Sequence, residues 1–278
     1  MTLSKIGTYF RTPKGMLVIA LLALIGIAYP VDGQQALPRL GLATLSAVIV
    51  DLLFMYRGGK MELPDSALLT GLIVAMVLGP AVPLGVPILA SAFAVTSKRI
   101  IRGKRGHIFN PAAIGLLIAG LLFTSEQSWW GGLGDLPPVL IVAVLALGVV
   151  IANRVNKMPS VLAFLGTYVG LLTVATMAGN PLSFADGFRE PMTGAALYFA
   201  FFMLSDPPTT PARASDQAWF ASVVAGVSVA CLALNWGGVY YLLVGLLAGN
   251  ALEAARRAIV SRRKTAPAAS QRLHASPI

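Results

Sequence analysis

Long apolar stretches, separated by short polar or Gly- and Pro-containing connections, run along most of this sequence. Ten of them can be drawn, at residues 16–30, 39–56, 66–80, 83–97, 111–124, 137–152, 160–178, 192–204, 217–234 and 238–255. Several are shorter than the roughly 20 apolar residues that cross a bilayer as a helix. The third and fourth meet at residues 79–83, which permit a tight turn or a broken helix. The pattern predicts an all-α polytopic membrane protein with about ten transmembrane helices.

The composition supports this class, because 56% of the 278 residues are hydrophobic and only 12% are charged. A soluble domain is about half apolar and a quarter charged, so the surplus apolar surface must face lipid or other helices. We expect a cytoplasmic leader at 1–15, a transmembrane domain at 16–255 and a disordered basic tail at 256–278. The single cysteine excludes an intrachain disulfide, and with two histidines no metal site is expected.

The positive charges predict the orientation of the helices. If the N-terminus is cytoplasmic and the segments alternate in direction, all but two of the 21 Lys and Arg residues fall on the cytoplasmic side. The exceptions are Arg39 and Arg189. This bias follows the positive-inside rule and places both termini in the cytoplasm. The net charge of +10 therefore reflects topology first and contact with anionic membrane lipid second, and nucleic acid is not an expected partner.

One sequence pattern occurs twice. Acidic residues, a Thr-Gly pair, an apolar run and a proline pair follow one another at 62–83, and again at 186–211. In the topology above, the first run starts inside and the second starts outside. This arrangement predicts an inverted repeat of five plus five helices, at about 16–124 and 137–255; chance recurrence of common residues is the alternative. Short, Gly/Pro-interrupted helices at equivalent positions point to a central site, so the two pairs are candidates: Thr70 and Gly71, Thr193 and Gly194.

Two further motifs supply candidate site residues. Phe109, Asn110 and Pro111 follow a basic loop and open the fifth apolar segment. Asn suits a helix cap and Pro the first turn, so the motif predicts either a capped helix start or a helix N-terminus that presents N–H groups to an anion. Asp206 and Pro207 end the eighth segment, where prolines stop the helix. This acid is either part of a loop or the counterpart of the proline turn in the first repeat.

Asp51 and the aromatic residues of two outer loops complete the candidates. Asp51 lies within the second segment, six residues before Arg57, so it is either a functional acid or an acid paired with arginine. The aromatic belt at the outer membrane interface is predicted to contain Trp129, Trp130, Trp236, Tyr240 and Tyr241. No P-loop, zinc-binding spacing, nucleophile elbow or dinucleotide fingerprint occurs in the sequence.

Four strings occur in the order known from one membrane-protein family: DSALLTG at 65–71, HIFNPAAIG at 107–115, LAFLGT at 162–167 and FFMLSDPPTTPAR at 201–213. Over roughly residues 15–255 the chain resembles RnfD, a membrane protein of the Rnf electron-transport complex, and its counterpart in the sodium-pumping NADH:quinone reductase. The resemblance implies a ten-helix inverted repeat similar to urea transporters, an FMN cofactor, and membrane redox subunits as partners. It also implies electron transfer coupled to ion movement in the bacterial plasma (inner) membrane.

The sequence departs from this family where the flavin is attached. The family links FMN through a phosphoester to the Thr of an (S/T)-G-A-T motif in the outer loop between the fifth and sixth helices. Here residues 124–138 form a short loop without that motif, and the string TGAA at 193–196 has Ala at the acceptor position. We therefore expect no covalent FMN, and either no flavin or FMN or riboflavin bound noncovalently. The residues expected to bind it are Thr70, Gly71, Phe109, Asn110, Pro111, Thr193, Gly194, Asp206 and Pro207.

Three functions stay open at this level. The first is a membrane subunit of an ion-coupled electron-transport system, which as an enzyme would be at most one subunit of a translocating oxidoreductase. The second is a channel or carrier for a small solute or a flavin. The third is a membrane anchor for a redox partner, or a membrane component of a biosynthetic gene cluster, as in the stand-alone relatives found among enediyne genes.

Overall fold

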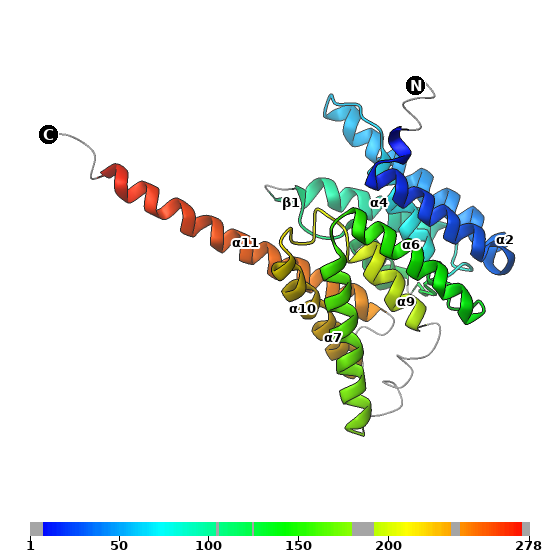
Figure 1. Cartoon of the computed structure of the whole chain (residues 1–278). Helices are drawn as coiled ribbons and strands as arrows, with labels where there is room; N and C mark the ends of the chain where they lie inside the picture. Colours follow the sequence, from blue (N-terminus) through cyan, green and yellow to red (C-terminus); the bar gives the residue numbers. More distant parts are fainter. Residues whose placement is uncertain (1–7, 104–105, 124, 180–191, 235–239, 274–278) are drawn as a thin grey trace.

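The computed structural model describes residues 8–103, 106–123, 125–179, 192–234 and 240–273 of an all-helical membrane protein, apart from one two-stranded hairpin. The N-terminal elements are α2 (Pro13–Arg57), α3 (Asp65–Val77), α4 (Gly85–Ile100), β1 (Arg102–Gly103), β2 (Gly106–His107) and α5 (Pro111–Phe123). The remaining elements are η1 (Trp130–Gly132), η2 (Pro138–Leu140), α6 (Ile141–Arg154), α7 (Met158–Met177), α9 (Met192–Tyr198), η3 (Phe199–Met203), α10 (Ala214–Ala233) and α11 (Tyr241–Leu273). Figure 1 shows the helices packed in one body, from which α11 projects.

Helix α2 folds back on itself although its backbone stays helical. A straight helix of its 45 residues would be about 67 Å long. Asp65 follows the end of α2 by only eight residues, which span at most about 28 Å. Its carboxylate nevertheless lies 2.9 Å from the Nζ atom of Lys14, at the start of α2. The ends of α2 are thus far closer than in a straight helix, and Figure 1 shows α2 turning back at the right-hand edge of the molecule.

The bend in α2 has a local cause. Pro30 and Pro38 lie inside the helix, and each removes a backbone hydrogen bond. The bend separates a first limb, Pro13–Val31, from a second limb, Gly33–Arg57. The first and second predicted spans are therefore both present, but the connection between them is helical rather than a loop.

Among the described residues, four segments are long and apolar enough to cross a membrane: the two limbs of α2, α7 and α10. Shorter apolar helices cover Asp65–Val77, Pro111–Phe123, Pro138–Arg154 and Met192–Met203. Together with α4 and α11, these eight helices cover most of the described residues of the ten predicted apolar segments. Helix α11 continues through Leu273, well into the segment assigned from sequence to the basic tail.

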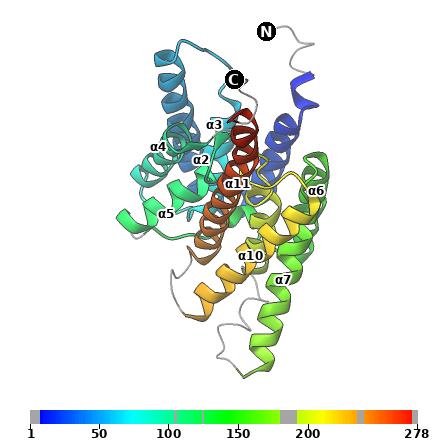
Figure 2. The same cartoon turned by 90° about the vertical axis from the view of Figure 1, so that its left-hand side faces the viewer.

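The same packing arrangement appears in both halves of the chain. Helix α4 packs between the second limb of α2 and α5, and α10 packs between α7 and α11 (Figure 2). Glycines set the closest approaches. A Cβ atom on Gly115 of α5 would overlap the carbonyl group of Ala90 in α4, and one on Gly245 of α11 would lie 2.8 Å from the carbonyl oxygen of Val224 in α10.

Two short helices, α3 and α9, meet in the interior and run in opposite directions. The last carbonyl of α3, on Val77, accepts hydrogen bonds from the backbone of Ser128 and Trp129, just before η1. Helix α9 begins in this same region, because Gly194 lies against Gly132 of η1. It then continues through η3, a π-helical turn of the kind that often marks functional sites.

A buried ion-pair cluster joins α2, α3 and α4. Asp51 is only 1% exposed, and its Oδ1 atom accepts hydrogen bonds from Nε and Nη2 of Arg99 at 2.9 and 2.6 Å. The Nζ atom of Lys98 lies 3.7 Å from the same oxygen and donates to Ser66 Oγ of α3. Asp51 is thus paired with an arginine, which was one of the two interpretations of this acid. Its partners are Arg99 and Lys98 of α4, and not Arg57.

Replacing Gly115 with Ala should destabilise the protein by about 2 kcal/mol, because α5 must move away from α4 to admit the methyl group. Gly41→Ala is the matched control, since a Cβ atom on this α2 glycine meets nothing within 4 Å. The control should be neutral or slightly stabilising. Thermal unfolding of both variants in detergent measures the difference. Equal unfolding temperatures would refute the close helix contact.

Removing the carboxylate in Asp51→Ala should cost about 3 kcal/mol, because Lys98 and Arg99 would then lie partly buried without an anion. Asp65→Ala breaks the ion pair with Lys14, whose side chain is 55% exposed, and should cost less than about 1 kcal/mol. Chemical unfolding of the two variants tests this ranking. A smaller loss for Asp51→Ala than for Asp65→Ala would contradict it.

Candidate functional site

Asn110 ties together three helices at one end of the molecule. Its Oδ1 atom accepts from the backbone N–H of Ala113 at 3.1 Å, so it caps α5. Its Nδ2 atom donates to the carbonyl oxygen of Met203, the last residue of η3, at 3.1 Å. Its backbone N–H donates to Oδ1 of Asn250 in α11 at 2.9 Å. The capped helix start, one of the two interpretations of this motif, is therefore present, and the cap also holds the two halves together.

Asp206 lies beside Asn110, at the end of η3, and pairs with the hairpin that precedes α5. Its Oδ2 atom lies 3.2 Å from His107 Nε2 on β2 and accepts from Thr209 Oγ1 at 3.0 Å. Pro207 is exposed and turns the chain away from η3. We call the group His107, Asn110, Asp206 and Asn250 the junction cluster. The predicted site residues of the two motifs therefore lie together around the junction cluster: Phe109, Asn110, Pro111, Asp206 and Pro207.

Lys157 adds a buried positive charge near the junction cluster. It precedes α7 and is 5% exposed, and its Nζ atom donates to the carbonyl oxygens of Thr210 and Pro211 at 3.3 and 2.6 Å. Burial lowers the pKa of this ammonium group, the nearby Arg257 lowers it further, and Asp206 opposes the shift. Sequence reasoning used Lys157 only as one of the positive charges that predict orientation. It could not single out this residue, because the carbonyl groups that surround it come from residues more than 50 positions away.

The Thr-Gly pairs lie elsewhere in the molecule. Thr70 Oγ1 donates to the carbonyl of Ser66 within α3, and Gly71 packs against the backbone of Thr44 in α2. Thr193 and Gly194 open α9 at the end of the molecule opposite to the junction cluster. The predicted site residues thus occupy three places, and only the group around Asn110 and Asp206 forms a shared polar network.

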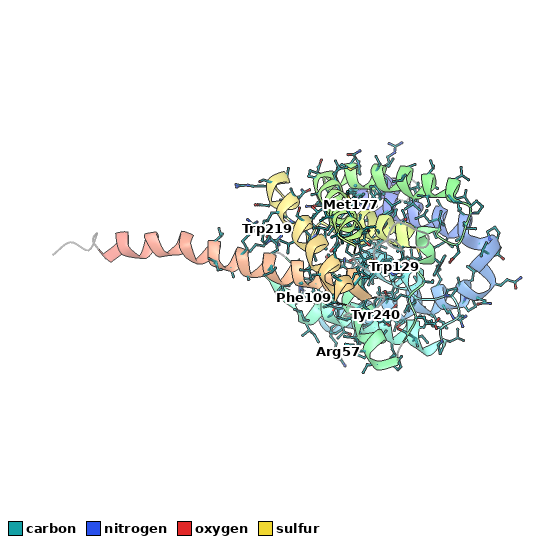
Figure 3. All side chains as sticks on the ribbon, turned by 90° about the horizontal axis from the view of Figure 1, so that it is seen from below. Arg57, Phe109, Trp129, Met177, Trp219 and Tyr240 are labelled. Atoms are coloured by element: carbon teal, nitrogen blue, oxygen red, sulfur yellow. The ribbon has the colours of Figure 1, made fainter. Side chains whose placement is uncertain are left out.

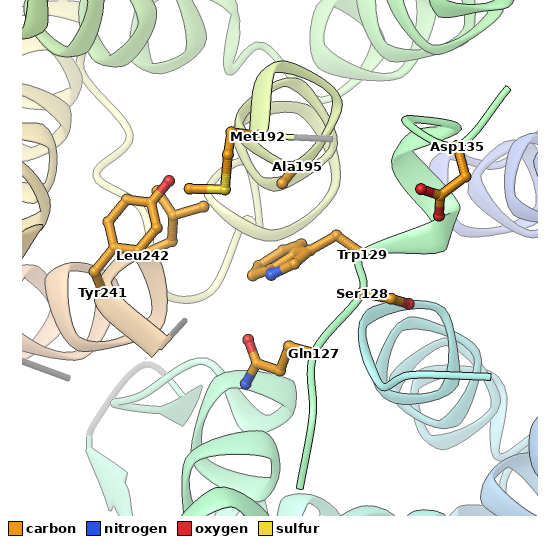
Figure 4. A pocket seen from close by; sticks show the side chains of 8 residues that line it. All are labelled: Gln127, Ser128, Trp129, Asp135, Met192, Ala195, Tyr241 and Leu242. Carbon is orange, nitrogen blue, oxygen red and sulfur yellow. The ribbon is translucent and has the colours of Figure 1, made fainter. Parts of the chain in front are cut away.

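The opposite end contains a cavity of about 130 Å³, shown in Figure 4. Its lining residues are Gln127, Ser128, Trp129, Asp135, Met192, Ala195, Tyr241 and Leu242. Sequence reasoning missed this site because its walls come from the loop after α5, from α9 and from α11. Drug-sized ligands occupy pockets of about 300–1,000 Å³, so this cavity has room for one ring-sized group.

The loop that forms one wall of the cavity corrects the prediction of an aromatic belt. Trp129 and Trp130 are 6% and 3% exposed, and Tyr241 is 2% exposed. Trp129 packs edge-on against Tyr198 and Phe199, and Trp130 Nε1 donates to the carbonyl of Ala75 at 2.8 Å. Figure 3 shows Trp129 in the interior of the bundle. The prediction that Trp129, Trp130 and Tyr241 face the interface is wrong, because the loop folds inward to satisfy the end of α3 and Tyr241 pairs with Tyr168 inside the bundle. Tyr240 is half-buried and donates to the carbonyl of Ser125, and Trp236 lies outside the described residues.

Asn110→Ala should destabilise the protein by about 2 kcal/mol, since it removes a helix cap and leaves the Met203 carbonyl with only the longer bond, 3.4 Å, from the backbone N–H of Asp206. Asn153→Ala, on the last turn of α6, is the control, because this residue is exposed and its side chain makes no hydrogen bond in the described part of the chain. Thermal unfolding in detergent should separate the two variants by several degrees. Similar unfolding temperatures would show that the junction cluster does not hold the halves together.

Comparison with known proteins relates the chain to one family. Residues 8–136 match the NQR2, RnfD, RnfE family. Proteins named as subunits of an ion-translocating oxidoreductase complex, from Shigella dysenteriae, Cronobacter sakazakii and Salmonella paratyphi A, are 34, 33 and 31% identical to the chain over 152, 141 and 140 residues. These matches cover 52, 48 and 48% of the chain, but only 42, 39 and 38% of the relatives.

The chain therefore spans about two fifths of the length of the relatives it matches. Two of the four diagnostic strings, at 65–71 and 107–115, lie inside the segment that matches the family. That segment also contains Asn110 and the loop that carries Gln127. The resemblance seen in the motifs is confirmed, and the N-terminal half of this chain is related to the NQR2, RnfD, RnfE family.

Proposed function

We propose that this chain is a membrane subunit of an ion-translocating oxidoreductase complex and that it binds FMN or riboflavin noncovalently. The match of residues 8–136 to the NQR2, RnfD, RnfE family carries this proposal. The relatives named above are subunits of such a complex by their names, so other membrane redox subunits are the partners we propose here. A translocating oxidoreductase also fits a chain whose polar groups gather at two opposite ends of an apolar bundle.

The proposed fold is a ten-helix inverted repeat of five plus five, similar to urea transporters. Two observations support it. Helices α3 and α9 run in opposite directions and meet where Tyr198 Oη donates to Met76 Sδ. The close approach of α4 and α5 at Gly115 also has a counterpart between α10 and α11 at Gly245.

The proposed orientation has both termini in the cytoplasm of the bacterial inner membrane. In its favour, three separate contacts of basic residues lie near the helix ends on the junction side. Arg154 donates to the backbone of Arg11, Lys14 pairs with Asp65, and Arg256 pairs with Asp216. Arg39 lies at the other end, where it donates to the carbonyls of Ala81 and Val82. If the junction end faces the cytoplasm, the excess of positive charge lies on the cytoplasmic side, where it can contact anionic lipid headgroups.

The residues on the outer side are compatible with a noncovalent flavin ring. The cavity offers two aromatic walls, from Trp129 and Tyr241, and a buried amide, from Gln127. A bound flavin would supply one- and two-electron transfer, and the chain would hold and orient it. None of the nine candidate residues derived from sequence lines the cavity itself, but two groups of them support helix α9, which forms one wall, and its continuation η3. Thr193 and Gly194 begin helix α9, which lines the cavity. Asn110 holds the other end of the same helical segment, because it donates to Met203 at the end of η3.

The absorption spectrum of the purified full chain tests this function. We expect visible flavin absorbance from protein produced with riboflavin available, and release of the flavin into the filtrate after denaturation, because nothing tethers it. Absence of flavin absorbance, together with no binding of added FMN or riboflavin, would contradict the proposal. Flavin that stays with the denatured chain would contradict noncovalent binding.

The same preparation separates the two other functions. Solute flux through liposomes that contain only this protein, without an electron donor, would identify a channel or carrier. A membrane anchor for a redox partner would instead show neither flux nor a loss of electron transfer on substitution of Thr70, Asn110 or Thr193.

A further inference from the structure

Gln127 is held rigidly by the end of α3. The backbone N–H of Gly79 donates to the carbonyl of Glu126, and Val77 receives the backbone N–H groups of Ser128 and Trp129, all at 3.1 Å. Gln127 itself forms a β-bridge with Leu78. These bonds fix the backbone on both sides of Gln127, so the direction of its side chain into the cavity is set by the fold (Figure 4).

The amide of Gln127 has no hydrogen-bond partner among the described residues. The residue is 9% exposed, and both its Oε1 and its Nε2 atoms are buried without a partner in this part of the chain. Exchanging the two atoms would not alter this, because neither position has a partner. A buried amide without partners is costly for a protein, so an unpaired donor next to an unpaired acceptor indicates a ligand that pairs with both.

Two of the other polar side chains that line the cavity, those of Tyr241 and Ser128, are hydrogen-bonded, and the third, Asp135, is exposed. The hydroxyl of Tyr241 is paired with that of Tyr168 at 2.8 Å, and Ser128 Oγ donates to the carbonyl of Leu78. Trp129, Met192 and Leu242 contribute apolar surface. Among the described lining residues, the buried polar group that is free to pair with a ligand is therefore the Gln127 amide, which lies between an aromatic ring and aliphatic side chains.

Volume and charge restrict the ligand further. An apolar cavity of about 150 Å³ is known to hold benzene, so about 130 Å³ fits the edge ring of a planar molecule. The lining residues include the acid Asp135 and neither Lys nor Arg. A phosphate would find no opposite charge among these described residues, which favours a neutral group.

We propose that the Gln127 cavity binds the edge of a neutral planar ring that carries adjacent C=O and N–H groups, as in cyclic amides and imides. The ring C=O accepts from Nε2 of Gln127, and the ring N–H donates to Oε1. Trp129 covers the face of the ring. The pyrimidine edge of a flavin belongs to this class, and the choice of flavin as the occupant rests on the function proposed above.

The test compares Gln127→Met with Gln34→Met in the purified full chain. Methionine keeps the length of the side chain but removes both hydrogen-bonding groups, and Gln34 is an exposed residue of α2. Quenching of riboflavin fluorescence during titration with protein reports binding. We expect Gln127→Met to weaken binding at least tenfold and Gln34→Met to leave it unchanged. Without ligand, the unfolding temperature of Gln127→Met should be equal to or above that of the parent, which shows that lost binding is not lost folding.

A ligand-side control uses riboflavin methylated at N3, which lacks the edge N–H. It should bind the parent protein at least tenfold more weakly than riboflavin, and Gln127→Met should not distinguish the two compounds.

Equal affinity of parent and Gln127→Met for riboflavin would overturn the proposed site. If the purified parent carries flavin but Gln127→Met carries as much, the site fails while the proposed function stands. If the parent neither carries nor binds a flavin, the proposed function fails, whereas binding of a simpler cyclic imide such as uracil to the parent but not to Gln127→Met would still support the site.

Discussion

A helix that ends inside an apolar interior leaves carbonyl groups that water cannot reach, and this constraint shapes the centre of the molecule. Helix α3 ends in this way at Val77, and η3 ends in this way at Met203. The loop after α5 donates its backbone N–H groups to Val77. The side chain of Asn110, just before α5, donates to Met203. Both ends of α5 therefore complete the hydrogen bonding of a broken helix, one from each half of the chain.

The two polar regions follow from this arrangement. The junction cluster forms where Asn110 meets the end of η3, and His107 and Asp206 are brought together by the same contact. The cavity forms where the loop after α5 covers the end of α3, which leaves Gln127 aimed inward. The two regions lie about 20 Å apart, at opposite ends of the 13-residue helix α5.

The sequence predicted the helices well because their signal is local. Apolar runs bounded by Gly, Pro and charged residues marked each helix, and Asn110-Pro111 marked the start of α5. The sequence predicted two separate segments here, at 16–30 and 39–56, because Pro30 and Pro38 flank polar residues and the sequence does not reveal that the backbone stays helical between them. The pairing of His107 with Asp206 joins residues 99 positions apart. The burial of Trp129 depends on the bond between its backbone N–H and the carbonyl of Val77. Neither this burial nor the His107–Asp206 pair could be predicted from the sequence, because both depend on residues far apart along the chain.

The glycine contacts described for the packing also limit how the molecule can move. Gly115 brings α5 against the backbone of α4, and Gly245 does the same for α11 and α10. Helices in contact at this distance cannot slide or rotate past each other without steric overlap. Each pair therefore moves as one rigid unit. The two units meet where the backbone N–H of Asn110 donates to the side chain of Asn250, so this contact is the pivot expected for any rearrangement of the protein.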